Sequence, residues 1–217
     1  MKKICICGGG SLGHVIAGYL SANGKATVSI LTNHPTAWQN KIEICVPDNG
    51  EMLIGNIACV SANPAEALLD AEIVLLCLPG FLIKDELIKI RDFINSGTYV
   101  GSVFSSTGFF FEALKLLNED IPLWGFQRVP FISRIKEYGH SANLLGYKGC
   151  YHIAVERDTD ANKELFRYWV ENSFDRPVTL LKNYLEASLT NSNPLLHTAR
   201  LYSMFHDWQP GISYPRN

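Results

Sequence analysis

The fold of this chain is decided by "CGGGSLGHV", residues 7–15, which contains the pattern G-x-G-x-x-G at Gly8, Gly10 and Gly13. Alone, the pattern is weak, because glycine turns are common. Here it follows an apolar strand pattern at residues 2–7, and a helical pattern begins directly after it. A strand, a glycine turn and a helix in this order form the context in which such a loop binds a dinucleotide.

Each glycine has its own expected role in such a loop. Gly8 permits the tight turn, Gly10 lets the backbone approach a pyrophosphate, and Gly13 lets the helix pack close to the strand. Ser11 and Leu12 stand at the helix N-terminus, whose free N–H groups favour an anion. We therefore expect these five residues to bind the cofactor. The alternative is a glycine turn with a purely structural role.

The second strand, residues 25–31, is followed by Thr32, Asn33 and His34. An Asp or Glu usually stands there and binds the adenosine 2′-hydroxyl. Without that carboxylate nothing repels a 2′-phosphate, and all three side chains can donate a hydrogen bond to one. We expect NADP or NAD as cofactor, with NADP slightly favoured and Thr32 and Asn33 as binding residues. The alternative is that Asn33 caps a turn before Pro35.

Leu78 and Pro79 end the buried strand pattern "AEIVLLCLP" at residues 71–79. In a parallel sheet, the ligand cleft opens at the carboxyl ends of the strands. We therefore expect Leu78 and Pro79 to line the nicotinamide side of the cofactor site. A plain helix-initiating turn at Pro79-Gly80 explains the same residues.

Strand and helix patterns alternate along most of the chain, and this predicts an α/β fold with a Rossmann-type, doubly wound, mostly parallel sheet. Asp48-Asn49-Gly50 predicts an inserted antiparallel hairpin. Residues 130–149 have a mixed pattern. We expect an NAD(P)-binding domain over residues 1–182. Residues 183–217 are expected to form a short C-terminal helical segment, the start of a truncated substrate or dimerisation domain.

The composition narrows the class of protein further. The formal charge is −2 and no basic block is present, so a nucleic-acid or anionic-membrane surface is disfavoured. The longest apolar run, residues 73–79, is far below the ~20 residues that a membrane span needs. The six cysteines show no C-x-x-C pair, so a zinc site is not expected. These features predict a soluble cytoplasmic protein with reduced thiols.

Four segments together resemble the opine dehydrogenase family (octopine and nopaline dehydrogenases), a relative of the 6-phosphogluconate dehydrogenase-like group. They are "CICGGGSLGHVIAGYL" from residue 5, "AEIVLLCLPGF" from residue 71, "VPFISRI" from residue 129 and "LEASLTNSNPLLHTARL" from residue 185. The last is the most specific, because the family carries N-x-N-P-x-x-H where its helical second domain begins. The resemblance covers nearly the whole chain, but only the N-terminal domain of the family and this junction.

The resemblance implies an oxidoreductase that reduces the imine formed between an amino acid and an α-keto acid, with hydride from NAD(P)H. The family histidine, an acid/base group, corresponds by motif to His197, with Asn193 as its neighbour. Histidine suits this role because it exchanges protons near neutral pH. A lone histidine on a helix is more often a packing or surface residue. The N-S-N-P context reverses that preference.

Arg128 and Ser133 flank a segment that lines the substrate cleft in the family, so the resemblance makes them substrate candidates. An arginine there would hold a keto-acid carboxylate with two hydrogen bonds. Arg128 departs from the smaller polar residue that the family pattern favours, and surface ion pairing is the alternative. Arg134 matches a family arginine and is a candidate for a structural role.

The chief departure from the family is length. The family histidine pairs with an Asp on the second domain, and an Arg there binds the keto acid, but this sequence ends at Asn217. We therefore expect an opine-type site that is incomplete in this chain. One alternative is a related 2-keto- or hydroxy-acid reductase whose site is completed by dimerisation through the C-terminal helices. Another is a dinucleotide-binding module without turnover.

Overall fold

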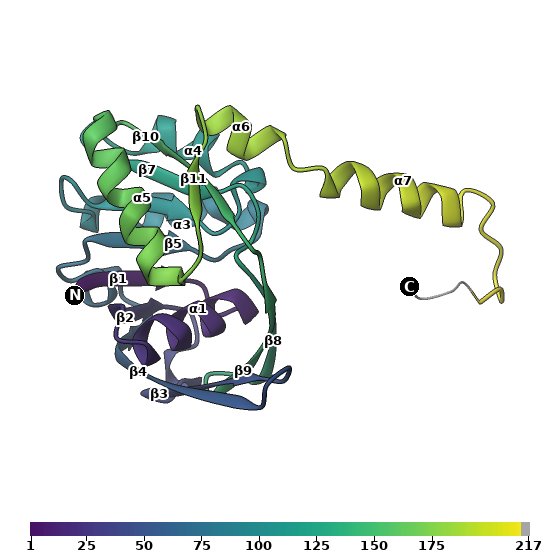
Figure 1. Ribbon diagram of the computed structural model, residues 1–217, viewed down its shortest axis with the longest axis horizontal. Helices are drawn as coiled ribbons and strands as arrows, with labels where there is room; N and C mark the ends of the chain where they lie inside the picture. The colour runs from purple at the N-terminus through teal and green to yellow at the C-terminus, as the bar shows by residue number, and fades with distance from the viewer. Residues whose placement is uncertain (214–217) are drawn as a thin grey trace.

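The computed structural model describes residues 1–213, except for the side chain of Pro194. Within this part of the chain the strands are β1 (Lys2–Cys7), β2 (Ala26–Leu31), β3 (Lys41–Val46), β4 (Glu51–Ser61), β5 (Ile73–Leu76), β6 (Tyr99–Ser102), β7 (Leu123–Phe126), β8 (Phe131–Glu137), β9 (Ser141–Tyr147), β10 (Tyr151–Glu156) and β11 (Val178–Leu180). They form one sheet in the order β11-β10-β7-β6-β5-β1-β2-β4-β3-β9-β8. The predicted Rossmann-type, mostly parallel α/β fold is confirmed (Figure 1).

Helices cover both faces of this sheet. They are α1 (Ser11–Ala22), α2 (Pro64–Ala67), α3 (Gly80–Ile90), α4 (Phe109–Leu116), α5 (Asp160–Phe174) and α6 (Tyr184–Leu189). One more helix, α7 (Asn193–Phe205), does not pack on the sheet. The 3-10 turns are η1 (Pro35–Ala37), η2 (Arg91–Phe93) and η3 (Ser105–Thr107). Ile16 of α1 and Phe166 of α5 belong to the core on one face. Ile83 of α3 and Phe110 of α4 belong to the core on the other.

The central strands bring the ends of three loops together. Strand β1 pairs in parallel with β2 and β5, and Cys7 lies opposite both Leu31 and Leu76. All three strands therefore end at the same edge of the sheet. The glycine loop, the segment after β2 and the turn after β5 start side by side at this edge, where open α/β sheets bind their ligands.

The hairpin β8–β9 occupies the segment whose sequence pattern was mixed. Strand β9 pairs in parallel with β3, and β8 pairs antiparallel with β9. The pairing is irregular between Ile132 and Ser133 and again between Ile135 and Glu137, which interrupts the two-residue alternation that marks a strand. In Figure 1, β8 runs past α1, against which it packs. The hairpin therefore forms a wall beside the glycine loop.

The sheet is less uniformly parallel than the strand–helix alternation suggests. The predicted hairpin around Asp48-Asn49-Gly50 is confirmed, with β3 antiparallel to β4. Strand β10 also pairs antiparallel, with β7. The segment before β10 is a hairpin rather than a helix, and the chain therefore returns without the right-handed crossover that a parallel strand needs.

The C-terminal elements behave differently from one another. Helix α6 packs on β7, β10 and η3, and its Ala187 is buried. Helix α7 projects away from the body (Figure 1). The division after residue 182 stays a prediction, and residues 214–217 of the expected helical segment lie outside the described residues. No helix among residues 1–213 is long and apolar enough to cross a membrane.

Candidate cofactor-binding site

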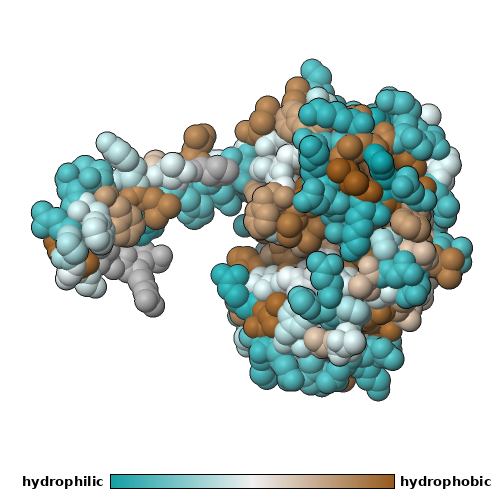
Figure 2. All heavy atoms as spheres, turned by 180° about the vertical axis from the view of Figure 1, so that it is seen from behind, coloured by the Kyte–Doolittle hydropathy of each residue, from teal (hydrophilic) through white to brown (hydrophobic). Residues whose placement is uncertain are grey.

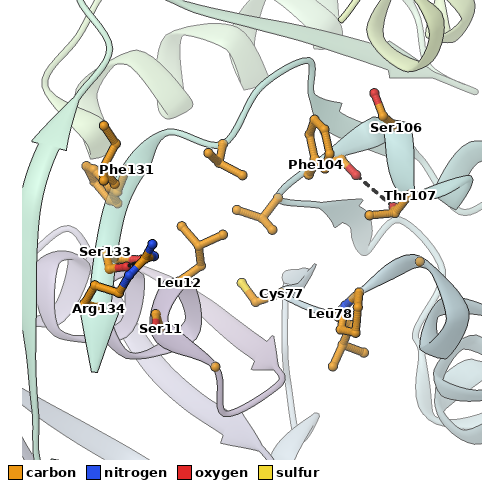
Figure 3. Close-up of a pocket in the computed structure, with 16 residues that line it drawn as sticks. Ser11, Leu12, Cys77, Leu78, Phe104, Ser106, Thr107, Phe131, Ser133 and Arg134 are labelled. Atoms are coloured by element: carbon orange, nitrogen blue, oxygen red, sulfur yellow. Dashed lines mark hydrogen bonds between the residues drawn. The ribbon is translucent and has the colours of Figure 1, made fainter. Parts of the chain in front are cut away.

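A cavity of about 710 Å³ opens at the edge where the parallel strands end. Apolar side chains make most of its wall, with a few polar groups between them (Figure 3), as in typical small-molecule sites. The lining residues are Gly10, Ser11, Leu12, Cys77, Leu78, Pro79, Gly80, Val103, Phe104, Ser106, Thr107, Val129, Phe131, Ile132, Ser133 and Arg134. Six of the residues expected from the sequence, Gly10, Ser11, Leu12, Leu78, Pro79 and Ser133, are thus brought together.

Two glycines of the loop are required by the fold itself. Gly8 has φ +117°, and a Cβ there would lie 2.7 Å from the Cys77 carbonyl oxygen. A Cβ on Gly13 would lie 2.2 Å from the Gly8 carbonyl oxygen. Neither position therefore accepts a side chain without moving the backbone. Their geometry explains the turn and the close approach of α1 to β1.

Gly10 differs, because a Cβ there would meet no atom within 4 Å. Its backbone is extended, with φ −80°, a conformation that any residue adopts. Gly10 nevertheless lines the cavity. The missing side chain at Gly10 therefore leaves room in the cavity rather than in the protein core.

The start of α1 lines the same cavity. Gly10 is its N-cap, no side chain caps the helix, and its first turn holds no acidic residue. The first N–H groups of a helix lack partners within the helix, and they attract anions. The Ser11 hydroxyl accepts a hydrogen bond from the backbone N–H of Ile135 at 3.2 Å, which fixes the helix start against β8.

A second, smaller cavity of about 170 Å³ lies on the other side of the glycine loop and shares Leu78 with the first. Its lining residues are Gly8, Gly9, Leu31, Thr32, Asn33, His34, Leu78, Glu86, Lys89 and Tyr138. The expected residues Thr32 and Asn33 therefore lie together with His34. The Tyr138 hydroxyl, from the end of the β8–β9 hairpin, is 3.4 Å from the Thr32 hydroxyl.

Glu86 brings a carboxyl group to the cavity where the sequence shows none after β2. It comes from α3, and its side chain is 17% exposed. Burial raises the pKa of the Glu86 carboxyl, whereas Lys89, whose Nζ lies 4.0 Å away, acts in the opposite direction. Both signs of charge thus meet in the cavity that also holds Thr32 and Asn33. The preference for NADP over NAD stays a prediction. The sequence did not indicate Glu86, because no motif links α3 to this cavity.

His14 is a buried residue that directly follows the glycine motif. Its Nε2 accepts a hydrogen bond from the Gly139 N–H at 2.7 Å, so the ring proton is on Nδ1, which donates to the Gly10 carbonyl oxygen at 3.0 Å. The ring also packs on Trp38, with 4.1 Å between ring centroids. His14 therefore holds the backbone of the glycine loop from behind and does not line either cavity.

Arg128 and Ser133, the two substrate candidates, lie in different places. Ser133 is buried and lines the large cavity. The Arg128 guanidinium donates a hydrogen bond to the Ser192 hydroxyl at 3.3 Å, at the start of α7, and Arg128 is not a lining residue. Its neighbour Val129 and the nearby Arg134 line the cavity instead. The role of both candidates in substrate binding stays a prediction.

His197 and Asn193 lie on α7 and are exposed. Neither lines the two cavities beside the glycine loop, so the structure does not bring them together with that loop. The Asp207 carboxylate forms an ion pair with its neighbour His206, with 2.7 Å between Oδ2 and Nε2. Within residues 1–213 no cluster of three or more His, Cys, Asp or Glu side chains is placed to hold a metal ion. The catalytic roles of His197 and Asn193 stay predictions.

The chain is similar in sequence to two dehydrogenases and to one uncharacterized protein. No family model matches the chain. An uncharacterized protein of Sinorhizobium fredii, y4xO, is 28% identical over 98% of this chain and 59% of its own length. Tauropine dehydrogenase of Arabella iricolor is 26% identical, over 96% of this chain and 56% of its own. Octopine dehydrogenase of Mizuhopecten yessoensis is 22% identical, over 95% of this chain and 55% of its own length.

Solved structures share the fold. Octopine dehydrogenase in complex with NADH and agmatine superposes with a TM-score of 0.81 at 20% identity, over 100% of this chain and 57% of its own. For NADP⁺-bound yersinopine dehydrogenase the TM-score is 0.63 at 16% identity, and the match covers 87% of this chain and 49% of that one. For 2-dehydropantoate 2-reductase from Porphyromonas gingivalis the TM-score is 0.71 at 15% identity, and the match covers 94% of this chain and 72% of that one. The expected resemblance to the opine dehydrogenases is confirmed, and the chain spans little more than half the length of these curated relatives.

Proposed function

We propose that this protein is an NAD(P)-dependent oxidoreductase whose cofactor lies across the glycine loop. The observation that carries the proposal is Gly10, a position that lines the large cavity and has no structural need to be glycine. The pyrophosphate would lie at the start of α1, the nicotinamide in the large cavity, and the adenosine at Thr32 and Asn33. The NADH and NADP⁺ held by related structures support the same cofactor class.

We further propose an opine-type reaction. Hydride from NAD(P)H adds to the carbon of an imine formed from an amino acid and an α-keto acid, and His197 donates a proton to the imine nitrogen, so that a secondary amine and NAD(P)⁺ form. Sequence similarity to tauropine and octopine dehydrogenases over nearly the whole chain supports this reaction class. Asn193 would orient the imidazole, and Ser133 would contact the substrate from β8. Arg128, whose guanidinium donates to Ser192 just before α7, would bind the keto-acid carboxylate.

His197 reaches the cavity, in this proposal, only when a further unit packs on α7. That unit is either a second domain, for which residues 183–217 are the start, or a second copy of the chain. The exposed apolar residues Leu195, Leu196, Leu201 and Tyr202 of α7 support such packing. Figure 2 shows hydrophobic side chains along this projecting helix.

The free cysteines and the cofactor class favour a cytoplasmic location.

The experiment that tests the cofactor proposal compares two glycine substitutions by fluorescence titration with NADH and NADPH. A Cβ at Gly10 fits the fold but enters the cavity, so Gly10→Ala should retain the thermal unfolding midpoint and lose at least about tenfold in affinity. Gly149→Ala is the matched control, because Gly149 lines neither cavity and a Cβ there would also meet no atom within 4 Å. Equal affinity of both variants, or no binding of either nucleotide by the native chain at millimolar concentration, contradicts the proposal.

A 2-keto-acid reductase is the second candidate, and the fold shared with 2-dehydropantoate 2-reductase favours it. The two reactions differ in their need for an amine. An opine-type enzyme oxidises NAD(P)H only when keto acid and amino acid are both present, whereas a keto-acid reductase needs the keto acid alone. His197→Gln should abolish turnover in the first case without changing NADH affinity. Binding without turnover under all these conditions supports the non-catalytic module.

A further inference from the structure

Arg134 is the charged side chain that lines the large cavity, within the part of the chain that the structure describes. It lies on β8, and Figure 3 shows its guanidinium beside Leu12 at the cavity wall. The residue is exposed, and its Nη1 donates to the Ser133 carbonyl oxygen at 2.9 Å. No carboxylate within residues 1–213 forms an ion pair with it. Most of its hydrogen-bond donors are therefore available to a ligand.

The position of Arg134 identifies the kind of ligand. The next residue, Ile135, donates its N–H to the Ser11 hydroxyl, so this part of β8 is fixed directly against the first turn of α1. The guanidinium and the uncapped helix start thus line one side of the same cavity. Both favour a negative charge, and a guanidinium can bind two oxygens of one phosphate group.

We propose that Arg134 binds the pyrophosphate of the cofactor, opposite the N–H groups at the start of α1. The inference rests on the proposed function and adds a residue to it. In a Rossmann-type loop the pyrophosphate lies at the helix N-terminus, close to the backbone of the glycine turn. Here the β8–β9 hairpin adds a charged side chain to the same anion. A keto-acid carboxylate is the other anion of the proposed reaction, but the proximity of Arg134 to Ser11 and Leu12 favours the pyrophosphate.

The test measures dissociation constants of NADH and of ADP-ribose, which keeps the pyrophosphate and lacks the nicotinamide. Arg134→Gln should weaken the binding of both ligands by about tenfold or more, as expected for the loss of a charge-assisted contact. Arg134→Lys keeps the charge but cannot form two parallel hydrogen bonds to one phosphate. Its dissociation constants should therefore lie between those of the native protein and of Arg134→Gln. Lys136→Gln is the matched control, because Lys136 is exposed on the same strand and lines neither cavity.

The possible results separate this inference from the proposed function. If the native protein binds neither nucleotide, the proposed function fails and the inference fails with it. If the native protein and Arg134→Gln bind NADH and ADP-ribose equally well, only the role of Arg134 is refuted. Weaker pyruvate binding to NADH-loaded Arg134→Gln, with unchanged NADH affinity, would assign the arginine to the substrate carboxylate instead. Equal thermal unfolding midpoints of the variants show that the comparison concerns folded protein.

Discussion

The imidazole of His14 joins the glycine loop to the turn between β8 and β9 through one donated and one accepted hydrogen bond. Because Nε2 accepts from the Gly139 N–H, a protonated ring would lose that bond. Burial lowers the pKa of His14 from its ordinary 6.5, against a smaller opposing effect of the Gly10 carbonyl. The folded protein therefore holds the neutral form.

The sign of the pH dependence follows from this difference. Below pH 6.5 the unfolded chain takes up a proton at His14 that the folded chain resists. The contribution of His14 to stability is full above this pH and is lost as the pH falls through the folded-state pKa. We expect the free energy of unfolding to fall from about pH 7.5 to about pH 5.5. Urea unfolding at both values measures this.

Substitution assigns this fall to His14. His14→Gln should lower stability by about 2 kcal/mol or more at neutral pH, because it disturbs two buried hydrogen bonds. It should also flatten the dependence on pH. His34→Gln, at an exposed histidine, should leave the native pH dependence in place. An unchanged slope in His14→Gln would assign the effect to another group.

Glu86 and its neighbour Lys89 make the cofactor preference testable at single residues. A carboxylate beside the 2′ position repels a 2′-phosphate, so Glu86→Gln should raise the affinity for NADPH relative to NADH severalfold. Asp85→Asn removes the same charge from an exposed neighbour that lines neither cavity and should not shift the ratio. Titration of both variants with each nucleotide gives the ratio directly. A lower NADPH:NADH affinity ratio in Glu86→Gln would contradict this arrangement.

At the scale of elements, the turn of the β8–β9 hairpin requires a glycine at Gly139. Gly139 has φ +72°, and a Cβ there would lie 2.0 Å from the Ala37 carbonyl oxygen. Gly50, in the β3–β4 turn, has a similar φ of +71° but open space around it. Gly50→Ala should therefore lower the free energy of unfolding by only about 1–2 kcal/mol, the energy of placing alanine in the left-handed backbone region. Gly139→Ala should cost at least about 3 kcal/mol, since the backbone must also move.

Denaturant unfolding of Gly139→Ala and Gly50→Ala checks this difference. NADH titration adds a second readout, because Arg134 and Tyr138 belong to the moved hairpin. Gly139→Ala should weaken NADH binding, while Gly50→Ala should leave it unchanged. If the two variants were equally stable, the contact with Ala37 would not be a constraint on the hairpin.

The sequence predicted those elements whose signals are local. The turn at Gly8 and the hairpin at Asp48-Asn49-Gly50 depend on neighbouring residues, and both are present. The β8–β9 hairpin lacks regular alternation, so its pairing with β3 could not be predicted from pattern alone. The same reason applies to the site. Glu86 and Arg134 reach the cavities only through tertiary structure, whereas Gly10 is marked by its motif.

At the scale of the whole molecule, the cavities and the C-terminal helix are separate. No lining residue of the two cavities follows Tyr138 in the chain. A chain that ends after Ser192 keeps α6 and the Arg128 contact but lacks α7. We expect this shortened chain to bind NADH within about twofold of the native affinity. A larger loss, measured by titration, would show that α7 contributes to the cofactor site.

Removal of α7 should also reduce self-association. Leu195 is 76% exposed and Tyr202 73%, an unusual exposure for large apolar side chains on one helix. Sedimentation velocity over a range of concentrations compares the native and shortened chains. We expect concentration-dependent association of the native chain and a monomeric shortened chain. Identical behaviour of the two would remove support for a partner on α7.

The pairing of β3 with β9 has a consequence for how the chain is made. Glu43 lies opposite Ser141, so the two strands leave the ribosome about a hundred residues apart. Until β9 arrives, the outer edge of β3 is open to other strands in the growing polypeptide or in its neighbours. The glycine loop exists early in synthesis, but its wall does not. The proposed cofactor site is therefore complete only after the hairpin has packed against α1.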